Sequence, residues 1–222
     1  MPAIYAVLTG DLVGSRQAGP AATSRTIALL DHAARSAPWA GASPLSRFRG
    51  DGWQLLLSDT SMSLRIALFL IAFLKSQGAE QVTRIGLGLG PVTSLGNGDL
   101  SAADGPAFHR AGAALDAMSR NERLVLAAAG LPSPALAALV SLSDTLARRW
   151  SKPQATALVH LLPPDAPTQV AVAAELSIRP QSLSDRLGAA GYDGIMAGLA
   201  GYEATLKDQA HKPDIDKYGS LA

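Results

Sequence analysis

Two aspartates in short glycine-containing segments are the residues of this 222-residue chain best suited to chemistry. Asp11 stands in LTGDLVGSR, directly after a short apolar segment, and Asp51 stands in FRGDGWQLLL, between two glycines. Carboxylate oxygens are the ligands that Mg²⁺ prefers, and this ion usually shares them with substrate phosphates. Brought together, Asp11 and Asp51 would hold Mg²⁺ (or Mn²⁺), and a pair of such ions could clamp the two oxygens of a phosphoryl transfer.

The residues after Asp11 add a second element to this site. Their backbone amides precede a predicted helix, where N–H groups are available to anions. The residues expected to bind a nucleotide phosphate in this way are Leu12, Val13, Gly14 and Ser15. The competing interpretation is local: Asp11 as a helix or turn cap, and Asp51 as a residue chosen for the backbone of a hairpin turn.

The elements that would position these residues follow a β-α-β-β-α-β order. Apolar and alternating segments predict strands at 3–9, 45–49, 53–57 and 82–90, with helices at 23–35 and 61–77. This order is typical of a ferredoxin-like, split βαβ arrangement, in which the first strand and the hairpin are neighbours. We therefore expect Asp11 and Asp51 to lie at one edge of the sheet.

A helix around 105–118 and a strand at 123–128 follow. Gly86, Gly88 and Gly90 alternate with apolar residues along the strand 82–90, so they share one face of it. That face either lets a helix pack closely or lets a ligand approach the backbone.

The C-terminal part is helical and contains a helix-turn-helix pattern at 168–191. Helices are predicted at 133–150 and 151–162, and the second of these would support the pair from beneath. The second helix of such a pair presents its first turns to the DNA major groove. The candidate DNA-binding residues are Arg179, Gln181, Ser182, Ser184 and Arg186.

Charge qualifies the DNA prediction. From residue 148 to 187 there are five basic and three acidic residues, a small surplus for a surface that must neutralise phosphates. The alternative is a trihelical unit for dimerisation or for contact with another protein. We expect a nucleotidyl cyclase-like domain at 1–131, an all-helical or winged helix-turn-helix domain at 132–205 and a polar tail at 206–222.

Composition excludes several classes of function. The chain has no cysteine, which removes disulfides, zinc-thiolate sites and thiol catalysis, and its net charge of +1 argues against a polybasic nucleic-acid coat. The longest apolar run, 66–74, is too short to span a bilayer, and residues 1–8 lack the basic start of a signal peptide. We expect a cytoplasmic protein with no membrane partner.

In their order and spacing, three segments resemble the core motifs of class III nucleotidyl cyclases. These are LTGDLVGSR, FRGDGWQLLL and RIGLGLGPV. The whole chain is similar to the bacterial SatD family, which joins such a domain to a helix-turn-helix and shares the pattern seen here from Gly105 to Asp116. The resemblance implies metal ligands at Asp11 and Asp51 and a homodimer with sites at its interface.

The resemblance is incomplete where catalysis would need it. The cyclases carry an Asn and, four residues later, an Arg that stabilise the transition state, and His109 and Ala113 occupy these positions here. Arg110 lies about 100° away around the helix. His109, Arg110 and Arg16 are the remaining candidates for a catalytic group.

These observations favour a nucleotide- and magnesium-binding transcriptional regulator with a DNA-binding helix-turn-helix. An active metal-dependent nucleotide cyclase or nucleotidyltransferase is the first alternative. A non-catalytic protein-interaction module, with a purely structural acidic pair, is the second.

Overall fold

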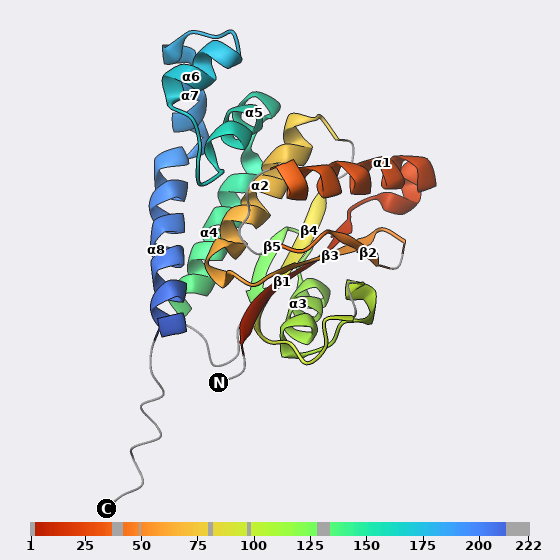
Figure 1. Cartoon of the computed structure of the whole chain (residues 1–222). Coiled ribbons are helices and arrows are strands. Elements are labelled where there is room, and N and C mark those ends of the chain that lie inside the picture. The colour runs from red at the N-terminus through yellow and green to blue at the C-terminus, as the bar shows by residue number, and fades with distance from the viewer. Residues whose placement is uncertain are drawn as a thin grey trace, which may run out of the picture.

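The computed structural model describes residues 3–36, 42–48, 50–79, 82–96, 99–127 and 134–211. Over these residues the chain forms an α+β fold with one five-stranded mixed sheet and eight α-helices (Figure 1). The strands are β1 (Ile4–Leu12), β2 (Ser46–Phe48), β3 (Gly52–Leu57), β4 (Thr83–Pro91) and β5 (Leu124–Ala127). The helices are α1 (Ser15–Ser36), α2 (Ser63–Ser76), α3 (Pro106–Ala117), α4 (Pro134–Arg149), α5 (Lys152–Leu161), α6 (Gln169–Glu175), α7 (Pro180–Ala190) and α8 (Tyr192–His211).

The sheet has the strand order β2-β3-β1-β4-β5. β1 is antiparallel to both of its neighbours, β2 is antiparallel to β3, and β5 runs parallel to β4 at the edge. Side chains alternate between the two faces. Ala6 and Leu8 pack in the large core with α2, whereas Val7 packs with Phe108 of α3 in a smaller core on the other face. Figure 1 shows α3 and α2 on opposite sides of the sheet.

The glycine face of β4 is covered by a helix. A Cβ at Gly86 would lie 2.2 Å from the Ala111 carbonyl oxygen, and a Cβ at Gly88 would lie 2.3 Å from the Ala107 carbonyl oxygen. Side chains larger than hydrogen would therefore push α3 away from the sheet. Of the two interpretations of this face, close helix packing is the one that the structure has.

Helix α2 lies between the sheet and the C-terminal helices. Its residues from Ser63 to Leu74 are all buried, and α4, α5 and α8 contact it on the side away from the sheet. The few polar groups on α2 are paired: the Ser63 and Tyr202 hydroxyls lie 2.9 Å apart, and Arg65 Nε donates to Glu203 Oε1 at 2.6 Å. Burial raises the pKa of the Tyr202 phenol far above its usual range, so this contact is neutral.

One hydrophobic cluster contains residues from both halves of the chain. The expected domain boundary near residue 131 falls at 128–133, outside the described residues. Residues 206–211, the first part of the expected polar tail, belong to α8 instead, which continues to His211, and Leu206 is buried. Residues 212–222 lie outside the described part of the chain.

Two predicted elements at the N-terminus are longer than expected. β1 does not stop at Gly10 but continues to Leu12, since Gly10 pairs with both Trp53 and Ile85. Asp11 is therefore a strand residue. The helix predicted from residue 23 already begins at Ser15 and is kinked at Gly19, whose φ of 81° is outside the helical range. None of the described helices has the length and hydropathy needed to cross a membrane.

The α3–β4 packing yields a prediction about stability. Gly88→Ala places a methyl group against α3 backbone, and we expect the free energy of unfolding to fall by about 1–3 kcal/mol in urea titrations. Gly112→Ala on α3 is the control, because its Cβ would meet nothing within 4 Å. This helical alanine should leave stability unchanged or raise it by up to about 1 kcal/mol. Equal effects of the two substitutions would contradict the packing.

Candidate functional site

Asp11 and Arg84 form an ion pair at one end of the sheet. They are directly opposite each other on β1 and β4. Arg84 Nε donates to Asp11 Oδ1 at 2.9 Å, and Nη2 of the same guanidinium donates to Asp11 Oδ2. The pKa of Arg84 is raised, mainly by this hydrogen bond and further by the charges of Asp11, Asp116 and Asp51. Such a bidentate pair fixes both partners, because two parallel bonds define the plane of the guanidinium.

Asp51 lies at the same end of the sheet, in the turn between β2 and β3. The pairing of Gly10 with Trp53 brings this turn beside the end of β1. Ser15 Oγ, at the start of α1, donates a hydrogen bond to Asp51 Oδ2. The structure thus brings both predicted aspartates to one edge of the sheet. Ser15, the first residue of α1, bonds there to the turn that carries Asp51.

The donor set at this edge does not fit a divalent ion bound to Asp11 as arranged. Both Asp11 oxygens already accept from Arg84, whose positive charge would repel a cation placed beside it. Among the residues that the structure describes, no group of three or more His, Cys, Asp or Glu side chains could hold a metal ion. The Mg²⁺ or Mn²⁺ site therefore stays a prediction, and it requires Arg84 to leave Asp11.

An arginine-lined hollow of about 530 Å³ lies at this edge. We call it the arginine hollow. Its lining contains four arginines and one carboxylate, so its own charge is positive. The lining residues are Asp11, Leu12, Val13, Gly14, Ser15, Arg16, Gln17, Arg84, Arg120 and Arg123. Arginine guanidinium groups match the planar, bidentate geometry of carboxylate and phosphate. The composition of the hollow therefore favours an anionic ligand.

Two of the four arginines are held in place by described contacts. Arg84 is fixed by Asp11, and Arg123 Nη1 donates to the carbonyl oxygens of Arg120 and Glu122 at 2.8 and 2.7 Å. Arg16 and Arg120 are exposed. The hollow thus combines two positioned cations with two solvent-facing ones that can adapt to a ligand.

The backbone of residues 12–15, which was expected to bind phosphate, lines the arginine hollow, but its amides are not all free to bind a ligand. The Val13 amide donates to the Val82 carbonyl at 2.9 Å, which extends the β1–β4 ladder. Gly14 adopts a φ of 78° and its carbonyl accepts from the amides of Gln17 and Ala18. Leu12, Gly14 and Ser15 remain as the candidates whose amides could contact an anion.

His109 and Arg110 lie at the opposite end of the sheet. Arg110 Nη1 donates to the Leu89 carbonyl at 2.6 Å, and His109 Nε2 lies 2.8 Å from Asp104 Oδ1. Since Leu89 and Arg84 are separated by most of β4, about 17 Å along the strand, these side chains do not join Asp11 within one chain. Of the three catalytic candidates, Arg16 alone lines the arginine hollow.

The helix-turn-helix pattern corresponds to α6 and α7. Val172, Ala173, Leu183 and Leu187 are buried, and α5 contacts both helices. Ser177 in the turn has a φ of 54°, the left-handed conformation that reverses the chain here. Trp150, at the end of α4, fixes the far end of α7 by donating its Nε1–H to the Ala190 carbonyl at 2.9 Å.

The surface of α7 carries both signs of charge. Arg179, Gln181 and Ser184 are exposed, whereas Ser182 and Arg186 are half-buried. The Gln181 amide donates to exposed Asp185 at 2.9 Å. A carboxylate thus lies on the face that would meet DNA, one helical turn from Gln181, and it opposes phosphate contact there.

Three arginines of the hollow, Arg84, Arg120 and Arg123, are absent from the predicted site. One sequence signal could have found Arg84. In RIGLGLGP it alternates in phase with the glycines, so it belongs to the face opposite Leu87, and antiparallel pairing with the first strand places it near Asp11. The positions of Arg120 and Arg123 depend on the path that the chain takes from α3 back to the sheet at β5.

Comparison with known proteins adds no assignment: no protein-family model matches this chain, and no curated protein matches it either.

Proposed function

We propose that this chain is a nucleotide-responsive regulator whose arginine hollow binds the phosphate groups of a nucleotide. The observation that supports it is the convergence of Arg16, Arg84, Arg120 and Arg123 around one hollow of about 530 Å³. Charge-assisted hydrogen bonds to phosphate oxygens are stronger than neutral ones, and arginine makes them in pairs. Four guanidinium groups can therefore serve more than one phosphate.

The proposed architecture agrees with this role. The order β2-β3-β1-β4, antiparallel throughout, supports a ferredoxin-like arrangement of the first four strands, with β5 added beside β4. A class III cyclase-like domain and membership of the SatD family are parts of the same proposal, and the order of the three motifs supports them. The second part of the proposal is that α6 and α7 act as a DNA-binding helix-turn-helix.

Catalytic cyclisation is less well supported than binding. His109 and Arg110 lie at the other end of β4, so neither joins Asp11 within one chain. A homodimer would place two copies of α7 against two DNA half-sites, and we include it in the regulator proposal for that reason.

Nucleotide binding is tested by calorimetry with ATP and GTP. We expect binding that weakens as salt rises, because the arginines are open to solvent and their charges are screened. Arg120→Ala should lower affinity about tenfold, the loss expected for one charge-assisted contact. Arg25→Ala removes an exposed arginine of α1 outside the hollow, and it should leave affinity within about twofold of the wild-type value.

The same titrations in EDTA and in Mg²⁺ address the metal expectation. With Arg84 on Asp11, nucleotide should bind without a divalent ion. Binding that occurs only with Mg²⁺ and is lost in Asp11→Asn and Asp51→Asn would instead support the two aspartates as metal ligands. Absence of ATP and GTP binding at millimolar concentration, or equal affinity in Arg120→Ala, would refute the hollow as the nucleotide site.

DNA binding is tested by fluorescence anisotropy with genomic fragments at graded salt. If α7 enters the major groove, Arg179→Ala should weaken binding and Asp185→Asn should strengthen it, each by about three- to tenfold, since one removes an attraction to phosphate and the other a repulsion. Lys207→Ala on α8 serves as the charge control. If both α7 variants bind like the wild type, the helical unit is better explained as a protein-interaction module.

A further inference from the structure

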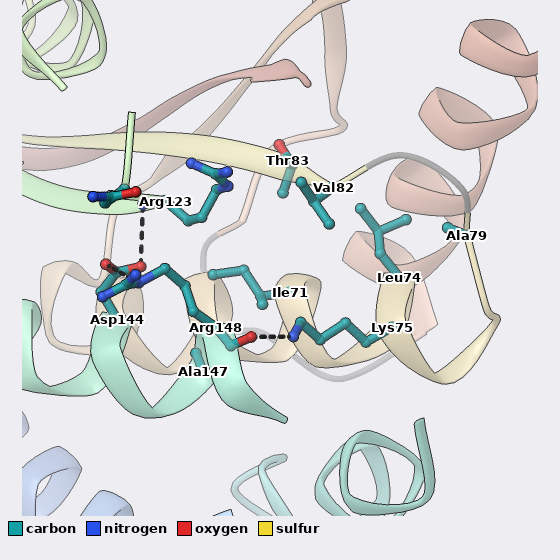
Figure 2. A pocket seen from close by; sticks show the side chains of 11 residues that line it. Ile71, Leu74, Lys75, Ala79, Val82, Thr83, Arg123, Asp144, Ala147 and Arg148 are labelled. Atoms are coloured by element: carbon teal, nitrogen blue, oxygen red, sulfur yellow. Dashed lines mark hydrogen bonds and ion pairs between the residues drawn. The ribbon is translucent and has the colours of Figure 1, made fainter. Parts of the chain in front are cut away.

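A second hollow, of about 240 Å³, lies between α2, the start of β4 and α4 (Figure 2). We call it the α2–α4 pocket. Its floor is apolar: Ile71 and Leu74 come from α2, Val82 precedes β4, and Ala147 comes from α4. Few polar groups on this floor could form hydrogen bonds to water. An apolar group of a ligand would be better accommodated there than water.

The polar side of the α2–α4 pocket is cationic. Lys75, Arg123 and Arg148 line it together with a single carboxylate, Asp144. Asp144 is already engaged, because Oδ1 accepts from the Arg123 amide at 3.1 Å and Oδ2 accepts from Arg148 Nε at 3.1 Å. The lining therefore holds more positive than negative charge, and the carboxylate is not available to a cationic ligand.

Donor groups remain on this side of the pocket. Lys75 Nζ donates to the carbonyl oxygens of Arg148 and Trp150 at 2.8 and 3.0 Å, which uses two of its three hydrogens. Figure 2 shows the Lys75 ammonium group pointing to the Arg148 carbonyl oxygen at the end of α4. Both of these partners are neutral carbonyl oxygens, and burial lowers the pKa of Lys75. A ligand carboxylate would supply a negatively charged partner.

We propose that the α2–α4 pocket binds a small organic monoanion with an apolar body, such as an aromatic or short aliphatic carboxylate. The carboxylate would lie among Lys75, Arg123 and Arg148, and the apolar body would lie on Ile71 and Leu74. A free phosphate fits less well because much of the lining is hydrocarbon, and a neutral molecule would gain no charge-assisted hydrogen bond from the cationic side of the pocket. This site is distinct from the arginine hollow, although Arg123 lines both.

The position of the pocket gives such a ligand a regulatory role. α4 contacts β5 on one side and α7 and α8 on the other, so its placement affects both the sheet and the helix-turn-helix unit. A ligand held between α2 and α4 would stabilise one placement of α4. The proposal does not depend on nucleotide or DNA binding.

Ligand-observed ¹⁹F NMR with 4-fluorobenzoate on the full chain tests the site, with 4-fluorobenzyl alcohol as the neutral counterpart. We expect the carboxylate to bind at least about tenfold more tightly than the alcohol, since each charge-assisted hydrogen bond contributes about this factor. Arg148→Met, and independently Lys75→Met, should weaken carboxylate binding by about tenfold while leaving the weak alcohol binding within about twofold of its original value.

Ala79→Phe fills the pocket from its partly exposed rim and should abolish binding of both probes, whereas Ala137→Phe on the exposed side of α4 should not. Equal affinity for acid and alcohol would overturn the proposal. No carboxylate binding at 10 mM (about −2.7 kcal/mol), or binding that survives Ala79→Phe, would also overturn it. Because no nucleotide is used, each of these results leaves the proposed function of the arginine hollow untouched.

Discussion

Helix α2 is buried along almost its whole length, and this burial determines how the sheet and the C-terminal helices are arranged. A helix that is apolar around its whole circumference cannot face water on any side, so it requires partners on both. The sheet and α1 cover one side of Ser63–Leu74, and α4, α5 and α8 cover the other. Two side-chain contacts between α2 and α8, Ser63 with Tyr202 and Arg65 with Glu203, fix the register of α8 on α2. Unpaired, these groups would each cost more than the bonds contribute.

Much of the fold was predictable because it follows from local patterns. The apolar run at 66–74 indicated the helix that became α2, alternation indicated β4, and the helix-turn-helix pattern at 168–191 indicated α6 and α7. The errors arose where tertiary contacts override local signals. Gly10 reads as a strand end, but here it is the strand position over which the Trp53 ring packs: a Cβ on it would lie 2.4 Å from that ring. The ring is held there by its bond to Thr83.

The candidate site, too, was predictable only where it follows from local patterns, and not where tertiary contacts decide. The meeting of Asp11 and Asp51 at one edge follows from strand order, which the sequence indicated. The side chains that bond to the two aspartates do not follow from strand order. Arg84 reaches Asp11 through the register of β4 on β1, and Ser15 reaches Asp51 through the placement of α1. An aspartate that looks like a metal ligand in a motif can be neutralised by a cation one strand away. The arginines change the chemistry expected at this edge from cation binding to anion binding.

The shared core of α2 also limits how the chain can transmit a binding event. If the sheet and the C-terminal helices swung apart about a hinge, both sides of α2 would be exposed to water. A displacement originating at the end of β1 therefore has to travel as a shear, with packed helices sliding by an ångström or two against one another. Such sliding keeps the hydrocarbon surfaces in contact throughout. A displacement of the sheet can therefore reach α7 without exposing the shared core to water.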